Sequence, residues 1–178
     1  MNETVKPAHW KQSGIRWLWI AALVIIVDQI TKLWIENNMA LGERIYVLPV
    51  FDIVRAHNPG AAFSFLADAG GWQRWVFSLF AIGASIAIVY WLRTVALSTH
   101  SLLACGLALI LGGAVGNVID RLEHGFVVDF VHVHWGAASF PAFNVADAAI
   151  SIGAAFVIID ALLDARRERA LRAGKSGS

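Results

Sequence analysis

The chain has 178 residues, of which 58% are hydrophobic and only 15% are charged. A soluble domain carries nearer a quarter of charged residues, so this composition indicates a chain that uses a lipid bilayer as its solvent. The formal net charge of +1 gives no field that would attract nucleic acid. The single cysteine, Cys105, excludes an internal disulfide framework and a zinc ribbon.

Four apolar stretches are long enough to cross a bilayer, which requires about 20 mostly apolar residues in an α-helix. The first stretch contains Asp28 and Lys32 and no small-x-small cleavage site follows it, so we interpret it as a retained helix and not as a cleaved signal peptide. The sequence predicts a single membrane domain over residues 1–178, with transmembrane helices near residues 17–35, 72–92, 101–119 and 145–163.

The basic residues predict how these helices are oriented. They are concentrated before the first stretch, directly after the second, and after the fourth at residues 166–175. The side of a membrane with more lysine and arginine faces the cytoplasm. We therefore expect cytoplasmic tails at residues 1–15 and 165–178, the second of them a frayed helix end, and both long connections on the outer side.

The two outer connections are predicted to contain short strands. Residues 44–54 are rich in β-branched and aromatic side chains around Pro49, which is typical of edge strands. Asn58-Pro59-Gly60 is a turn signal, and residues 125–135 are interpreted as a further strand. The expected fold is therefore an α-helical membrane protein with four helices and a small group of strands on the outer side.

Polar residues in and beside the apolar stretches are concentrated at one level. Asp28 and Lys32 lie four residues apart, on one face of the outer half of the first helix. Ionisable groups inside a membrane are costly and usually functional. The third helix, the second outer connection and the fourth helix contribute further polar residues at this level: Asn117, Asp120, Arg121, Asp129, Asn144 and Asp147.

Several of these residues have a purely structural alternative. Asp28 and Lys32 suit an ion pair that fixes the first helix as well as they suit a direct role. Arg121 suits an interfacial side chain whose charge reaches the headgroups. Asp147 suits a helix cap, because a carboxylate at a helix N-terminus interacts favourably with the helix dipole.

Small residues allow the third and fourth helices to approach closely. Gly112 and Gly116 are four residues apart, as are Ala149 and Gly153. This small-xxx-small spacing is typical of tight helix contacts in membranes. Close packing there would bring the outer ends of the two helices together, a contact that spacing alone leaves open.

Two carboxylates held close together favour peptide hydrolysis without a metal. They cannot both ionise easily, so they share one proton. The ionised member draws a proton from water, while the other hydrogen-bonds the scissile carbonyl.

His132 and His134 form a pattern that can bind zinc. On a strand, however, these two histidines would point away from Asp129, and no HExxH motif is present. We therefore expect no catalytic metal and no cofactor.

Five segments follow one another along these predicted helices and connections: DQITK at residues 28–32, NPGAAFS at 58–64, GGAVGNVIDR at 112–121, VVDF at 127–130 and FNVAD at 143–147. Together they resemble the DQxTK, NxGAAFS, GGAxGNxxDR, VxDF and FNxAD segments of the bacterial lipoprotein signal peptidases, also called signal peptidase II. Each segment is modest evidence alone, but the set in this order is specific. The resemblance extends over roughly residues 15–163.

This resemblance implies an aspartyl endopeptidase of the bacterial inner membrane. Such an enzyme removes the signal peptide from prolipoproteins, just before a cysteine that carries a diacylglyceryl group. The resemblance implies that Asp129 and Asp147 form the catalytic pair toward the periplasmic face. The implied substrate-binding and supporting residues are Asn58, Asn117, Arg121, Asn144, Asp28 and Lys32.

The resemblance also implies the partners and the outer structure. The expected partners are the diacylglyceryl-modified prolipoprotein, membrane lipid and inhibitors of the globomycin type, and no nucleic acid is expected. The strands of the first outer connection would form an extracytoplasmic β-cradle over the membrane surface.

A proton-coupled carrier is the alternative from a different functional class, because intramembrane Asp28, Lys32 and Asp147 would suit it. Carriers place their charged sites near the midplane of the bilayer, whereas these residues are concentrated toward one face. A structural scaffold would explain the helices but not the polar cluster.

Overall fold

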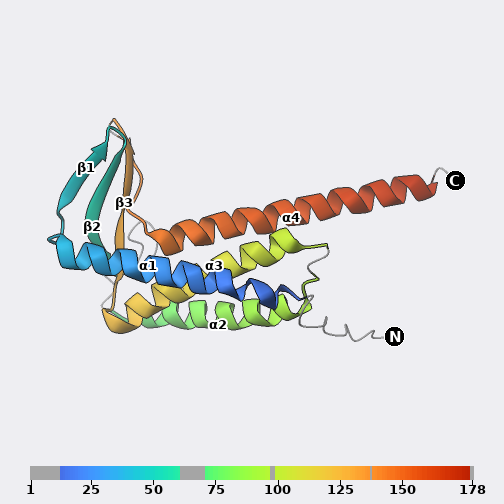
Figure 1. Ribbon diagram of the computed structural model, residues 1–178, viewed down its shortest axis with the longest axis horizontal. Helices are drawn as coiled ribbons and strands as arrows, with labels where there is room; N and C mark the ends of the chain where they lie inside the picture. Colours follow the sequence, from blue (N-terminus) through green and yellow to red (C-terminus); the bar gives the residue numbers. More distant parts are fainter. Residues whose placement is uncertain (1–12, 61–70, 97–98, 137, 177–178) are drawn as a thin grey trace.

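The computed structural model describes residues 13–60, 71–96, 99–136 and 138–176. Within them, long helices lie along one another and a sheet stands at one end of the bundle (Figure 1). The helices are α1 (Leu18–Asn38), α2 (Gln73–Thr94), α3 (Ser101–Glu123) and α4 (Val145–Ser176), and the 3-10 turn η2 (Gly14–Trp17) leads into α1. All four are long and apolar enough to cross a membrane.

Helix α3 is the central helix of the bundle and contacts each of the other three. In its most apolar window 61% of the residues are buried, against 22% in α1, 11% in α2 and 22% in α4. Large apolar side chains on the outer helices are exposed, among them Leu79 and Phe80 on α2 and Ile158 on α4. So much exposed apolar surface suits contact with lipid tails and not with water.

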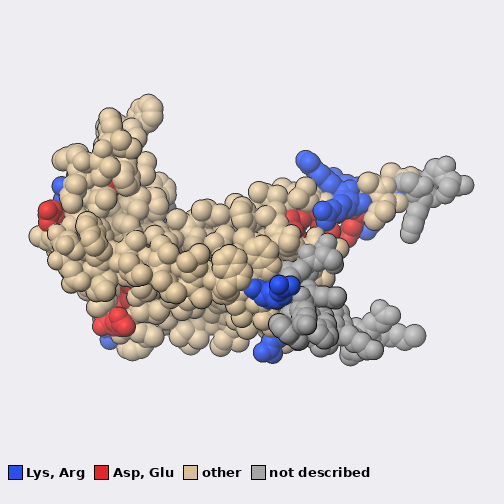
Figure 2. Space-filling view, in the orientation of Figure 1, with Lys and Arg blue, Asp and Glu red and all other residues tan. Residues whose placement is uncertain are grey.

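Charged side chains mark the two ends of the bundle. In Figure 2 the basic residues gather mainly at the end away from the sheet, and the visible surface between the ends is almost entirely uncharged. This pattern matches a bundle whose middle part lies in hydrocarbon. The expected fold class, four membrane helices with a small sheet, is confirmed.

Glycines of α3 determine how closely its neighbours approach. A Cβ atom at Gly113 would lie only 2.3 Å from the Ala146 carbonyl oxygen of α4, and one at Gly106 would lie 2.7 Å from the Gly153 carbonyl oxygen. Gly106 and Gly113 are two helical turns apart on the face toward α4. The backbones of α3 and α4 are therefore in direct contact along this face.

Gly112 and Gly116 mainly serve a different contact from the expected one. A Cβ atom at Gly112 would lie 2.7 Å from the Val24 Cβ atom of α1, and one at Gly116 would lie 2.6 Å from a carboxylate oxygen of Asp28. The expected close approach of α3 and α4 is present, and Gly153 of α4 takes part in it, because a Cβ atom there would lie 2.6 Å from the Gly106 carbonyl oxygen. Gly112 and Gly116, however, face mainly α1 and not α4. Adjacent helix positions differ by about 100°, so Gly112 and Gly113 face different helices.

Helix α4 continues far beyond its apolar stretch and projects past the other helices (Figure 1). The tail predicted from residue 165 is helical as far as Ser176 and is not a frayed end. Alanine, leucine, arginine and glutamate, which favour helix, dominate this part of the sequence. Arg172 and Glu168 also pair across one turn at 3.5 Å. The predicted tail at residues 1–15 lies mostly outside the described residues.

The sheet contains β1 (Arg44–Leu48), β2 (Phe51–Asn58), β3 (Val127–Trp135) and β4 (Ala138–Ser139), in that order and with antiparallel neighbours. Pro49 lies in the turn between β1 and β2, where its missing N–H costs no ladder hydrogen bond. A hydrophobic cluster holds the base of β3 against the end of α1; its buried members are Ile35, Met39, Val128 and Phe130.

Candidate active site

Asp129 is a buried carboxyl group on β3, only 3% exposed. Its Oδ1 accepts a hydrogen bond of 2.7 Å from Asn144 Nδ2, and its Oδ2 accepts one of 3.1 Å from Asn58 Nδ2. Burial, and next the negative charge of Asp147, raise the pKa of Asp129 to about 7. This carboxyl group can therefore carry a proton near neutral pH.

Asp147 lies in the first turn of α4 and takes part in the helix cap. Its N–H donates to Asn144 Oδ1 at 2.9 Å, and the Asn144 N–H donates to Asp147 Oδ2 at 3.3 Å. This reciprocal pair is a capping box, so the structural alternative for Asp147 describes part of its role. Its Oδ1 also accepts a hydrogen bond of 2.8 Å from Asn117 Nδ2.

Two asparagines connect the aspartates. Asn144 is fully buried, and its Nδ2 lies within hydrogen-bond distance of Asp129, of Asn117 Oδ1 at 3.2 Å and of the Val128 carbonyl oxygen at 3.3 Å. Asn117 in turn donates to Asp147. Because β3, α3 and α4 each supply one member of this network, the position of both aspartates depends on how these three elements pack.

Lys32 lies directly behind this network and is only 3% exposed. Its Nζ atom is 2.8 Å from Asp28 Oδ2, 2.9 Å from Asp120 Oδ2 and 3.0 Å from Asn117 Oδ1. Asp28 Oδ1 accepts a hydrogen bond of 2.9 Å from the Ala146 N–H of α4. The Asp28–Lys32 ion pair therefore also joins α1 to α3 and to the start of α4.

Asp120 and Gln29 complete this buried network and were not among the predicted site residues. Gln29 Nε2 donates to Asp120 Oδ1 at 2.9 Å, and Asp120 Oδ2 accepts a hydrogen bond of 3.1 Å from the Val128 N–H of β3. Gln29 is part of the DQITK segment, and Asp120 is part of the GGAVGNVIDR segment. Those two segments were the signal that could have identified both residues.

Arg121 and Asn58 border the network on its outer side. Arg121 donates to the carbonyl oxygens of Asn117 and Gly60, both at 3.3 Å, and its buried Nε atom has no hydrogen-bond partner among the described residues. Asn58 Oδ1 accepts a hydrogen bond of 3.1 Å from the Gly60 N–H, which fixes the turn after β2. The rest of the NPGAAFS segment, residues 61–64, lies outside the described residues.

A cavity of about 640 Å³ opens beside the two aspartates. One wall is polar and contains Asn58, Asn117, Arg121, Asp129 and Asp147. The rest of the lining is mostly apolar and includes Phe140, Pro141, Phe143, Ile150 and Ile152. Asn144, Asp28 and Lys32 lie behind the polar wall and do not line the cavity. A mostly apolar cavity with a few convergent polar groups is typical of a binding site.

Comparison with known proteins identifies the family. Residues 20–163 match the family described as signal peptidase (SPase) II. The chain belongs to the signal peptidase II family. It is 48% identical over 163 residues to a lipoprotein signal peptidase of Shewanella halifaxensis, covering 92% of this chain and 95% of that protein. It is 50% identical over 158 residues to one of Shewanella woodyi, covering 88% of each chain. The resemblance seen in the sequence is thus confirmed.

A solved structure of a bacterial membrane enzyme, determined at 2.3 Å by the in meso method, has the same fold as this signal peptidase II family member. The TM-score is 0.75 at 34% identity, and the match covers 84% of this chain and 89% of the other. A second bacterial membrane enzyme, determined at 1.9 Å, has a TM-score of 0.71 at 31% identity, with 86% and 98% covered.

Proposed function

We propose that this chain is an aspartyl endopeptidase that removes the signal peptide from prolipoproteins, with Asp129 and Asp147 as its catalytic pair. The proposal rests mainly on one observation: Asn144 holds the carboxyl groups of Asp129 and Asp147 beside the cavity. The pKa of Asp129 is raised to about 7. The names of relatives at 48% and 50% identity, lipoprotein signal peptidase, support the substrate class.

The proposed mechanism uses one proton shared by the pair. We place this proton on Asp129, because its side chain is buried on β3 and lies near the charge of Asp147, and both raise its pKa. Ionised Asp147 takes a proton from a water molecule, and the oxygen of that water attacks the scissile carbonyl carbon. Asp129 hydrogen-bonds the carbonyl oxygen, and the tetrahedral intermediate then collapses as a proton passes to the leaving nitrogen. No step requires a metal ion.

The cavity walls suggest how the substrate is held. Arg121, whose Nε atom has no hydrogen-bond partner within the described part of the chain, would bind a backbone carbonyl group of the substrate. The amides of Asn58 and Asn117 would bind further carbonyl groups. The apolar walls would accept the residues beside the scissile bond and the diacylglyceryl-modified cysteine. Inhibitors of the globomycin type would occupy the same cavity.

The residues behind the polar wall would act by positioning. Asn144 holds both aspartates, while Lys32 with Asp28 fixes Asn117 and the start of α4. A change at these positions would displace a catalytic aspartate without removing a reacting group.

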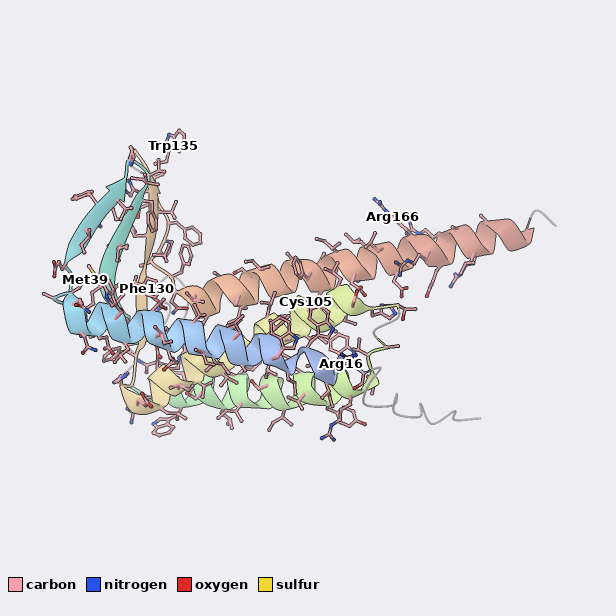
Figure 3. All side chains as sticks on the ribbon, in the orientation of Figure 1. Arg16, Met39, Cys105, Phe130, Trp135 and Arg166 are labelled. Atoms are coloured by element: carbon pink, nitrogen blue, oxygen red, sulfur yellow. The ribbon has the colours of Figure 1, made fainter. Side chains whose placement is uncertain are left out.

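We also propose that the chain lies in the bacterial inner membrane with both termini in the cytoplasm and the catalytic pair at the periplasmic face. Arg16 and Arg166 lie at the end of the bundle opposite Trp135 and the sheet (Figure 3). The positive-inside rule supports a cytoplasmic position for that end. A lipid-modified substrate stays in the bilayer, so the site at the outer interface would meet its cleavage point.

Cleavage of a defined precursor tests this function. The purified chain in detergent is given a prolipoprotein whose cysteine carries diacylglyceryl, and the same precursor without the lipid. We expect cleavage just before the lipidated cysteine, little cleavage of the unmodified precursor, and inhibition by a globomycin-type cyclic peptide. Equal cleavage of both precursors, or of neither, would contradict the proposal.

A further inference from the structure

Three metal-ligating side chains gather on the sheet, away from the cavity described above. Asp52 on β2 is fully buried, and its neighbour across the ladder is His132 on β3. Asp52, His132 and His134 each offer one ligand atom, and these atoms lie within 4.8 Å of one another. One carboxylate with two imidazoles is a donor set that zinc takes in proteins.

The spacing of these atoms suits one ion. Asp52 Oδ2 lies 3.4 Å from His132 Nδ1 and 3.1 Å from His134 Nε2. Ligand atoms at about 2.0–2.2 Å from a tetrahedral zinc ion are roughly 3.4 Å apart. Among the described residues, the second oxygen of Asp52, Oδ1, is buried without a hydrogen-bond partner, and the 3.1 Å approach of His134 Nε2 to Asp52 Oδ2 lacks the geometry of a hydrogen bond. Buried polar atoms are rarely left in this state.

Ser139 on β4 fixes the far side of the His132 ring. His132 Nε2 lies 2.8 Å from Ser139 Oγ. When Nε2–H donates to this hydroxyl, the lone pair of Nδ1 points toward Asp52, which is the arrangement of a metal-binding histidine with its outer hydrogen bond. The opposite tautomer would satisfy His132 without a metal, but Asp52 Oδ1 would still have no hydrogen-bond partner among the described residues.

Arg44 is the competing cation at this position. Its Nη1 atom lies 3.4 Å from Asp52 Oδ2. The Arg44 side chain is 44% exposed, whereas that of Asp52 is fully buried. Arg44 can therefore move into solvent when a stronger cation binds, and Asp52 cannot.

We propose that Asp52, His132 and His134 bind one divalent transition metal ion of the zinc type, and that this ion clamps β2 to β3. Such a clamp would add support where the sheet has little: every residue of β1 is exposed, and the cluster members on β3, of which the last is Val131, do not reach the end of the strand at His134 and Trp135. Metal binding to the folded sheet adds directly to its stability. The site is structural and separate from the catalytic pair.

Zinc titration of the full-length chain tests this site. The protein is purified in detergent without a histidine tag, stripped with EDTA and titrated with Zn²⁺ against a chromophoric chelator. We expect one bound zinc per chain and a thermal unfolding temperature that rises until that ratio is reached. Co²⁺ in place of Zn²⁺ should give the intense visible absorption of a tetrahedral site.

Substitutions identify the ligands. Asp52→Asn and His134→Ala should each weaken zinc binding at least about 100-fold, and Ser139→Ala should weaken it about 10-fold. His124→Ala is the matched control, because His124 lies outside the cluster, and it should bind zinc like wild type. Equal zinc affinity in Asp52→Asn and wild type, or no saturable binding at one zinc per chain, would overturn the proposal.

Two further measurements keep the proposal independent of mutant folding and of the catalytic function. A Co²⁺ spectrum of the wild-type chain that shows only octahedral cobalt would overturn it. Turnover of prolipoprotein well below the unfolding temperature should survive stripping with EDTA, since the cluster does not line the cavity. Turnover lost on stripping and restored by zinc would contradict the structural role.

Discussion

At the scale of single residues, Asp129 is a carboxyl group whose surroundings favour its protonated form. Its burial and the nearby charge of Asp147 raise its pKa to about 7, and amide groups of Asn58 and Asn144 fix both of its oxygens. Because the two aspartates interact, this pKa describes the pair when activity is measured. The pH dependence of turnover therefore reports directly on the catalytic pair.

The pair should lose activity as the pH rises through about 7, because the shared proton is then lost. Above that pH we expect kcat/KM for a lipidated prolipoprotein to fall about tenfold per pH unit. The measurement is initial-rate kinetics in detergent between pH 5 and about 9. A rate that stays constant through this range would mean that no proton held by Asp129 takes part.

The same proton should make the folded state sensitive to pH. The folded-state pKa of Asp129, about 7, is above its ordinary value of 3.8. Between these values the folded chain binds more protons than the unfolded chain, so this contribution to stability is full below 3.8 and is lost as the pH rises through about 7. Asp129→Asn should remove this part of the pH dependence of the unfolding temperature, and an unchanged dependence would contradict the assignment.

Lys32 compensates two buried carboxylates, so its loss should destabilise the fold. Lys32→Met leaves Asp28 and Asp120 without their cation, at a cost of about 3–5 kcal/mol. Adding Asp28→Asn should restore part of this loss, because one carboxylate charge is then removed. Thermal unfolding in detergent alongside turnover measures both effects.

Arg172→Met is the matched control for that experiment. The Arg172 side chain is 82% exposed and that of its ion-pair partner Glu168 is 62% exposed. Such surface ion pairs contribute little to the free energy of unfolding. Its unfolding temperature should match wild type. If Lys32→Met also unfolds like wild type yet cleaves nothing, Lys32 acts on the substrate itself and its positioning role is wrong.

The sequence could predict that Asp28 and Lys32 suit an ion pair, because helical spacing alone brings residues four apart onto one face. It could not predict that Asp120 shares the same lysine, because this depends on how α3 is rotated toward α1. Asn144 shows a similar limit. The sequence places it beside the start of the fourth helix, but its hydrogen bond to Asp129 of 2.7 Å requires the packed sheet.

At the scale of helices and strands, the contact between α3 and α4 determines where Asp147 lies. Gly113→Ala should separate these helices, because the new Cβ atom would lie 2.3 Å from the Ala146 carbonyl oxygen, one residue before Asp147. We expect a destabilisation of about 1–3 kcal/mol and a clear loss of turnover. Unfolding temperature and kcat/KM, measured on the same preparation, test this expectation.

Gly83→Ala is the control for that substitution. Gly83 is also in a membrane helix, but a Cβ atom there would meet nothing within 4 Å. Its stability should be unchanged or slightly higher, because alanine favours helix more than glycine does. If Gly113→Ala behaved like Gly83→Ala, the helix contact would not control the site.

Apolar length predicted the four helices well, but it could not predict their polar ends. Helix α4 continues to Ser176 because local helix propensity persists after hydrophobicity ends. The approximate positions of the strands were predictable from the sequence, but the register in which they pair was not. The ladder shifts between Tyr46 and Leu48 and again between Ile53 and Ala56, and such irregularities depend on packing and not on alternation.

At the scale of the whole molecule, the two ends of the bundle differ in how their arginines are held. At the sheet end, Arg55 lies 3.7 Å from Glu36 and donates to backbone carbonyls, and Arg44 lies near Asp52. At the opposite end, exposed Arg93 lies in the last turn of α2, and further exposed arginines lie along the C-terminal part of α4. A count of basic residues therefore understates the difference in charge available to anionic lipid.

Reporter fusions test the resulting orientation. Fusions after Arg93 and after Arg167 should behave as cytoplasmic, and a fusion near Trp135 should behave as periplasmic, because the basic end stays inside. A fusion near Asp68, outside the described residues, should also be periplasmic. A periplasmic C-terminus would place the aspartates in the wrong compartment and would contradict the proposed topology.

The most direct measurement is turnover of a diacylglyceryl-modified prolipoprotein by Asp129→Asn and by Asp147→Asn. Asparagine keeps the shape of each side chain but cannot exchange a proton, so each variant should lose at least about 10³-fold in kcat/KM. Both should still unfold cooperatively in detergent. Turnover within about tenfold of wild type in either folded variant would contradict the assignment of Asp129 and Asp147 as the catalytic pair.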